Sequence, residues 1–112
     1  MKLNELFELY LEDIDLTHQD TTLDSIRYVY NSGLAKKYGN KKLESIKFKE
    51  IKKYQKELLN GKHKTKDGKT YSISYINKII ALLKRLLKYA NIMSYGDFTV
   101  TQIRVLESVT SI

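Results

Sequence analysis

The stretch YSISYINKIIALLKRLLKYANIMSY, residues 71–95, carries the strongest structural pattern in this sequence of 112 residues. It contains no Asp or Glu, and its basic residues are Lys78, Lys84, Arg85 and Lys88. Surface helices usually place an acid one turn from each cation, which stabilises the helix by about 0.3 kcal/mol per pair. Because this stretch has no such pairs, we expect something outside the chain to compensate its charge.

At 100° per residue, the apolar side chains of this stretch gather on one half of a helix and its cations on the other. The residues that we expect to be buried are Ile76, Ile79, Ile80, Leu82, Leu83, Leu86, Leu87, Ala90 and Met93. Ser72 or Ser74 is expected to cap the first turn. The pattern therefore predicts a long last helix with a core face and a cationic strip, formed by its four basic residues.

Two helices are predicted in the first 40 residues. The first is indicated by apolar residues at helical spacing, with acids on the other face. These apolar residues are Leu3, Leu6, Phe7, Tyr10, Leu11 and Ile14. The second runs from a capping signature at Thr21–Asp24 to a turn at Gly39, and Gly33 is expected to loosen it near its end.

A third helix is predicted between a short extended piece, from which Leu43 and Ile46 point inward, and a turn at Asn60–Gly61. The residues expected on its apolar side are Phe48, Ile51, Tyr54, Leu58 and Leu59. Its outer face alternates Lys and Glu, which we interpret as a solvated surface. The polar residues 61–71, GKHKTKDGKTY, then form either a small hairpin around Asp67-Gly68 or a mobile loop.

The charge of the chain is unevenly distributed. The net charge is +7, but residues 1–24 hold seven acids and one Lys, whereas residues 25–96 hold 18 bases and four acids. A basic body behind an acidic first helix favours a polyanion as the partner of one face. From charge alone, lysines that merely keep a small domain soluble are an equally good explanation.

Composition and motifs exclude several classes of protein. The chain has no Cys, and no run of 18 apolar residues that would span a membrane. Its start lacks the pattern of a signal peptide, so we expect a cytoplasmic protein. No glycine-rich phosphate loop occurs, and His18 and His63 lie at no metal-ligand spacing. We therefore expect no catalytic residues, no cofactor and no metal in this chain.

Two segments resemble the core-binding, or SAM-like N-terminal, domain of phage integrases of the tyrosine recombinase family. They are TTLDSIRYVYNSGLAKKYGNKKLESI, residues 21–46, and SISYINKIIALLKRLLKYANIMSYG, residues 72–96. The family pattern fG-x-k-x-L-x-x-I corresponds to Tyr38–Ile46. The pattern S-x-x-T/Y-I-N-x-I-x-x-L-x-x-x-L-x-Y-A corresponds to Ser72–Ala90. The sequence departs from the family at Lys36, where a Pro is common, at Lys47, where a Thr often caps the third helix, and after the fourth helix, where the usual Asn-Pro is absent.

The resemblance implies an all-α fold, a four-helix SAM-like core-binding bundle with a long basic last helix and a short irregular C-terminal tail. It assigns residues 1–96 to the DNA-binding domain and residues 97–112 to a linker or the start of a catalytic domain. In that tail, Val100, Ile103, Leu106 and Val109 fit a weak helix as well as a linker. The family's catalytic Arg, His-x-x-Arg and Tyr are absent, so this chain is expected not to be an enzyme, although its parent protein would be a tyrosine recombinase.

In this family the second and fourth helices approach the major groove, and this implication falls on the segments that the charge pattern favours. The residues expected to contact DNA are Thr22, Ser25, Arg27, Lys36, Lys37, Lys62, Lys64, Lys66, Lys69, Ser74, Asn77, Lys78, Lys84, Arg85 and Lys88. The implied partners are double-stranded DNA, the catalytic domain of the same parent protein and other integrase protomers on DNA, and no membrane. The expected function is to clamp duplex DNA near the strand-exchange site during integration or recombination.

Two other readings stay open at this point. A transcriptional regulator of the helix-turn-helix type would also bind DNA, but it requires a turn of three or four residues between its two helices, and residues 61–71 are too long for that. A protein-interaction module is the other reading, in which the acidic first helix of one copy pairs with the basic last helix of another.

Overall fold

The computed structural model describes residues 1–14, 20–65, 67–100 and 103. Its helical elements are α1 (Leu3–Ile14), α2 (Asp20–Val29), the π-helical segment η1 (Tyr30–Leu34), α3 (Ala35–Tyr38), the 3₁₀ turn η2 (Leu43–Ser45), α4 (Phe48–Leu59) and α5 (Ile73–Ile92). In the described residues, β structure is confined to isolated bridges between Lys2 and Lys42 and between Lys64 and Thr70. The predicted all-α fold is confirmed.

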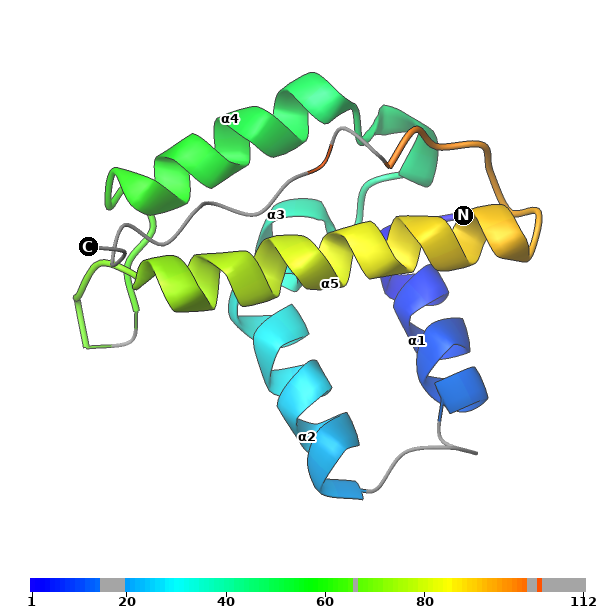
Figure 1. Ribbon diagram of the computed structural model, residues 1–112, viewed down its shortest axis with the longest axis horizontal. Helices are drawn as coiled ribbons and strands as arrows, with labels where there is room; N and C mark the ends of the chain where they lie inside the picture. Colours follow the sequence, from blue (N-terminus) through cyan, green and yellow to red (C-terminus); the bar gives the residue numbers. More distant parts are fainter. Residues whose placement is uncertain (15–19, 66, 101–102, 104–112) are drawn as a thin grey trace, which may run out of the picture.

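Helix α5 is the centre of the bundle. Figure 1 shows it lying across α1 and α2, with α4 along its other side, and it packs against all three and against η1. Its buried residues are Ile76, Ile79, Ile80, Leu82, Leu83, Leu86, Leu87 and Ala90, as predicted. The predicted burial of Met93 was wrong, because α5 ends at Ile92 and the Met93 side chain is 42% exposed.

Helix α2, η1 and α3 form one continuous helix that contains a π turn. The residues at both junctions, Val29, Leu34 and Ala35, keep right-handed helical backbone angles. The turn includes Gly33, where the sequence predicted a loosened helix. Figure 1 shows α2 descending from this point, so that its first turn is the part of the second helix farthest from α5.

The start of α1 is docked on the turn that follows α3. The backbone amides of Leu3 and Asn4 donate to the carbonyls of Lys41 and Gly39 at 3.1 and 3.0 Å. A β-carbon on Gly39 would lie 2.5 Å from the Ala35 carbonyl oxygen and 2.6 Å from Asn4 Oδ1. Position 39 therefore requires glycine, because the start of α1 and the end of α3 leave no room there for a β-carbon.

The buried side of α4 is rotated from the side that hydrophobicity predicts. Ile51, Tyr54 and Leu58 are buried as expected, but Phe48 and Leu59 are 39% and 45% exposed. Both point roughly 100° away from the centre of the buried stripe at 100° per residue. On the opposite edge of the stripe, Glu57 is buried, so the interpretation of all the acids of α4 as solvated was also wrong.

The loop and the tail both fold back on the bundle. Residues 60–72 separate α4 from α5, so no turn of three or four residues joins these two helices. The bridge between Lys64 and Thr70 gives the loop its predicted hairpin character, with Gly68 at a φ of +77°. In the tail, the Asn91 side chain hydrogen-bonds the backbone of Phe98, and Ile103 is 2% exposed. Lys66, Leu106 and Val109 lie outside the described residues.

Candidate nucleic-acid interface

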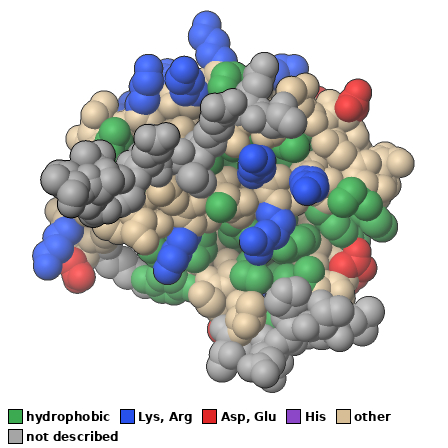
Figure 2. All heavy atoms as spheres, in the orientation of Figure 1, with side chains coloured by type: hydrophobic (Ala, Val, Ile, Leu, Met, Phe, Trp, Pro, Cys, Tyr) green, Lys and Arg blue, Asp and Glu red, His purple; other side chains and the backbone are tan. Residues whose placement is uncertain are grey.

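The cationic strip lies on the solvent side of α5. Lys78, Arg85 and Lys88 are exposed and Lys84 is half-buried. With a rise of 1.5 Å per residue, the strip is about 15 Å long. Figure 2 shows Lys and Arg side chains over α5 in the middle of this face, while Asp and Glu appear towards its edges.

No carboxylate in the described part of the chain forms an ion pair with the strip. The acidic helix α1 comes close to α5 beside it, where the Tyr89 hydroxyl donates to the Asp13 carboxylate. Burial and this hydrogen bond raise the pKa of Tyr89, so the hydroxyl keeps its proton. The strip therefore remains an uncompensated positive surface.

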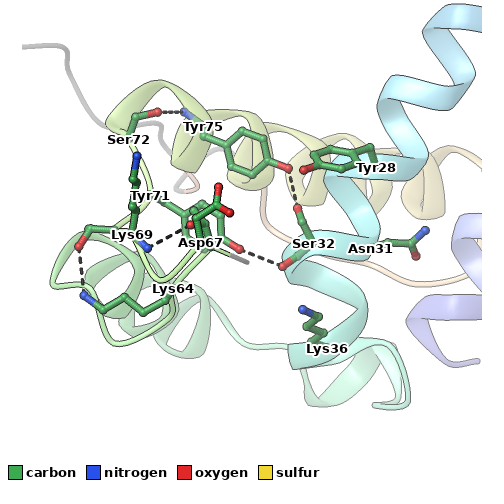
Figure 3. Close-up of a pocket in the computed structure, with 12 residues that line it drawn as sticks. Tyr28, Asn31, Ser32, Lys36, Lys64, Asp67, Lys69, Tyr71, Ser72 and Tyr75 are labelled. Atoms are coloured by element: carbon green, nitrogen blue, oxygen red, sulfur yellow. Dashed lines mark hydrogen bonds between the residues drawn. The ribbon is translucent and has the colours of Figure 1, made fainter.

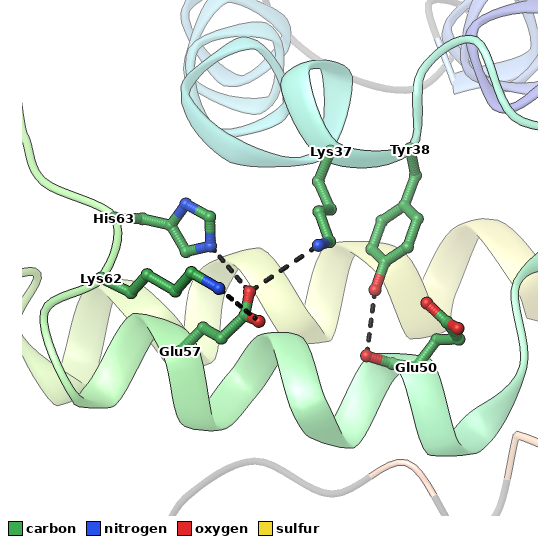
Figure 4. Close-up of polar contacts among 6 residues, drawn as sticks. All are labelled: Lys37, Tyr38, Glu50, Glu57, Lys62 and His63. Carbon is green, nitrogen blue, oxygen red and sulfur yellow. Dashed lines mark hydrogen bonds and ion pairs between the residues drawn. The ribbon is translucent and has the colours of Figure 1, made fainter.

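The basic residues Lys37, Lys62 and His63 surround one buried carboxylate instead. Glu57 on α4 is 9% exposed, and it lies 3.7 Å from Lys37 Nζ, 3.3 Å from Lys62 Nζ and 3.0 Å from His63 Nε2. Figure 4 shows that α3 and the loop after α4 supply these groups from opposite sides. The hydrogen bond from His63 lowers the pKa of Glu57 to about 2, and the hydrogen bond from Lys62 and the charges of Lys37 and Lys62 act in the same direction.

This cluster gives two of the predicted interface residues an acidic partner within the fold. Lys37 and Lys62 both lie within ion-pair distance of Glu57, so they share one carboxylate within the fold. Arg27 is compensated more weakly, because its ion pair with Asp24 at 3.5 Å is solvent-exposed. Arg27, Lys37 and Lys62 thus have an acidic partner within the fold, and in the described part of the chain the residues of the cationic strip have none.

A polar groove of about 900 Å³ lies between the second helix and residues 64–75. It brings together Lys36, Lys64 and Lys69, three of the predicted residues, from two segments far apart in the sequence. Figure 3 shows Tyr71 and Tyr75 reaching across from the loop and the start of α5 to the second helix. We call this the tyrosine groove, after its lining residues Tyr28, Tyr71 and Tyr75.

Ser32 is the anchor point of the tyrosine groove. Its hydroxyl lies 2.6 Å from the Tyr75 hydroxyl, and its carbonyl accepts a hydrogen bond from the Tyr71 hydroxyl at 3.3 Å. The rings of Tyr71 and Tyr75 are stacked with centroids 5.4 Å apart. Burial raises the pKa of Tyr71. These contacts fix the hairpin loop against the second helix, and sequence reasoning missed them because residues 32 and 75 are distant in the chain.

The remaining predicted residues are placed separately. Thr22 and Ser25 are exposed on the first turns of α2, the end of this helix that Figure 1 shows farther from α5. Ser74 is exposed and Asn77 half-buried in the first turns of α5. Lys66 is outside the described residues. Within the described ranges, no group of three or more His, Cys, Asp or Glu is arranged to hold a metal ion, and no helix has the length and apolar character of a membrane span.

The sequence matches one family model, described as phage integrase, N-terminal SAM-like domain, over residues 2–59. The match covers α1 to α4, which include the turn at Gly39 and the helix with the π turn. No curated protein and no solved structure matches the chain.

Proposed function

Because the chain belongs to the family of phage integrase N-terminal SAM-like domains, we propose that it is the DNA-binding module of a site-specific recombinase and that it clamps duplex DNA near the strand-exchange site. Strand cleavage would then belong to a catalytic domain of the same parent protein. Other protomers bound to the same DNA would complete the recombination complex.

The observation that carries this proposal is the cationic strip of α5. Four cations within about 15 Å repel one another, which costs stability unless anions approach. A DNA strand presents a phosphate about every 3.4 Å along the duplex axis, so a strip of this length can meet several phosphates of one strand. Binding would release the counterions condensed on those phosphates, which supplies most of the affinity in sequence-independent contacts.

The tyrosine groove adds three lysines outside α5 to the basic residues that could contact DNA. Lys36, Lys64 and Lys69 make no ion pair with a described carboxylate. Ser74 and Asn77 lie in the first turns of α5, before Lys78, the first residue of the cationic strip. Polar side chains of this kind reach phosphates or base edges in protein–DNA interfaces.

The proposal is tested by the salt dependence of duplex binding. Fluorescence anisotropy with a labelled duplex of about 20 base pairs would compare the wild type with the triple variant K84A/R85A/K88A. Each neutralised phosphate contributes about −0.9 to the slope of log K against log[salt], so losing three contacts flattens the slope by about 2.7.

The matched control is K49A/K52A/K53A, which removes an equal number of positive charges from the exposed face of α4. It should keep the wild-type slope. Equal flattening by both variants would mean that net charge, and not the cationic strip, determines binding. If sedimentation showed a dimer that dissociates in salt, and anisotropy showed no binding of duplex DNA, the proposal would be contradicted. A protein-interaction module would then be favoured.

A further inference from the structure

We propose that the tyrosine groove holds an unpaired nucleotide of DNA, with its base stacked on Tyr28 and its phosphates bound by Lys36, Lys64 and Lys69. This inference rests on the proposed function, since it specifies which part of the bound DNA reaches the groove. It differs from phosphate contacts along a duplex, because it requires a base that has left the helical stack.

Tyr28 is the residue that the fold itself leaves unused. Its side chain is 61% exposed, and in the described part of the chain its hydroxyl forms no hydrogen bond. Its ring is nevertheless oriented by a T-shaped contact with the ring of Tyr75, with centroids 6.5 Å apart and planes at 80°. By contrast, the hydroxyls of Tyr71 and Tyr75 are both engaged with Ser32. An exposed ring that is oriented by one aromatic neighbour is suited to stacking on a base.

The π turn places Lys36 on the same side of the helix as Tyr28. They are eight positions apart, which in an uninterrupted α-helix would set their directions roughly 80° apart. A π turn takes up about one extra residue, and this brings the difference down to roughly 20°. Both residues consequently line the tyrosine groove. The rare backbone form thus has a consequence for the site: it aligns a cation with an exposed aromatic ring.

The lysines across the groove complete a phosphate site. Lys64 is oriented by a hydrogen bond from Nζ to the Thr70 hydroxyl at 3.2 Å, as Figure 3 shows. Asp67 lines the same groove, but it forms no ion pair with a described lysine. The lining is therefore net positive, and its volume of about 900 Å³ is ample for one nucleotide.

An unpaired base is favoured over a paired one for a geometric reason. Bases inside a duplex are stacked on their neighbours, and their faces are closed to a protein ring. A base that is unpaired exposes its aromatic face at little cost. Because all four bases have such a face, the site would accept any of them.

The test compares two labelled duplexes that differ by a bulge of two unpaired thymidines in one strand. The wild type should bind the bulged duplex about tenfold more tightly than the fully paired one, as expected for one aromatic stacking contact. Tyr28→Ala should reduce this ratio to about one. Tyr28→Phe keeps the ring and loses only the unbonded hydroxyl, so it should retain the ratio.

Further arms separate this inference from the proposed function. The variant K84A/R85A/K88A should weaken binding of both duplexes and leave their ratio unchanged. A wild type that binds the bulged duplex no better than the paired one overturns the inference, as does a Tyr28→Ala variant that keeps the preference. Free thymidine monophosphate, added at the same concentration as the bulged duplex, should not remove the preference for that duplex. If it did, the groove would be a site for free nucleotides and the inference would be overturned. Tyr28-dependent binding of unpaired thymidines without any affinity for paired duplex would uphold the inference and contradict the proposed function.

Discussion

Gly33 and Tyr54 lie so close together that a β-carbon added to Gly33 would be 2.7 Å from the Tyr54 hydroxyl oxygen. The same carbon would be 3.2 Å from Ile79 Cδ1 on α5. Gly33→Ala is therefore expected to destabilise the protein by about 1–3 kcal/mol through overpacking. Alanine's better helix propensity, worth about 1 kcal/mol, offsets only part of this. Urea denaturation followed by circular dichroism measures the difference.

A second substitution identifies the cause of that loss. Tyr54→Phe removes the oxygen that the new methyl group would meet, so the double variant G33A/Y54F should recover part of the stability lost in G33A. Strictly additive effects of the two substitutions would contradict the steric explanation, because residues in contact are expected to show coupling.

Ser72 caps α5, and Ser74 does not. The Ser72 hydroxyl accepts a hydrogen bond from the Tyr75 backbone amide at 3.2 Å. Ser72→Ala is expected to cost about 1 kcal/mol of unfolding free energy. Ser74→Ala, at an exposed helical position two residues later, is the matched control and should change stability by less than about 0.5 kcal/mol. A larger loss in the Ser74 variant would place the start of the helix elsewhere.

The Glu57 cluster makes stability depend on acid pH. Because the pKa of Glu57 is lowered from 4.5 to about 2, its ionised form stabilises the fold above about pH 4.5, and this contribution is lost as the pH falls towards about 2. The variant Glu57→Gln lacks the charge at every pH. The difference in unfolding free energy between wild type and this variant should therefore be largest near neutral pH and shrink on acidification.

The control for that experiment is Glu50→Gln. Glu50 is an exposed residue of the same helix, and it forms no ion pair in the described part of the chain. Its variant should follow the wild-type pH profile. If Glu57→Gln differed from the wild type by a constant amount between about pH 7 and pH 3, the internal ion cluster would not be a source of stability.

Asn91 fixes the start of the tail to α5. Its side chain donates to the Phe98 carbonyl at 2.8 Å and accepts from the Phe98 amide at 2.7 Å. Asn91→Ala should cost about 1–2 kcal/mol and expose this amide. Hydrogen exchange at Phe98 should accelerate strongly in this variant, whereas Thr99→Ala, an exposed neighbour, should leave it unchanged. Unchanged exchange in Asn91→Ala would show that other contacts hold the tail.

The sequence was sufficient for the parts of the fold that depend on one periodic pattern. The core face of α5 and the apolar stripe of α1 follow from helical spacing. The Tyr38-Gly39 turn was recognised as a motif, and its physical reason, the closeness of Asn4 and Ala35 to Gly39, became visible in the structure. Tyr10 and Tyr54 were expected on the apolar sides of their helices, and both are buried.

Features that depend on two distant segments were not predictable in this way. Glu57 has the composition of a solvated residue, and its burial results from Lys37 and His63, which arrive from elsewhere in the chain. A π turn has no propensity signal beyond the glycine, so the alignment of Tyr28 with Lys36 was equally hidden. For the interface, the sequence indicated the cations. It gave no basis for separating Lys37 and Lys62, which pair with Glu57, from the cationic strip, for which the described residues provide no acidic partner.

The most direct measurement for the central claim is an NMR titration of the isotope-labelled protein with a duplex oligonucleotide at low ionic strength. The backbone amides of Lys78, Lys84, Arg85 and Lys88 should shift as DNA is added and return as salt is raised. Those of Lys49, Lys52 and Lys53, on the exposed face of α4, should move little. Amides of α5 that stay in place at the lowest salt concentration would contradict the claim that the cationic strip binds the phosphates of a duplex.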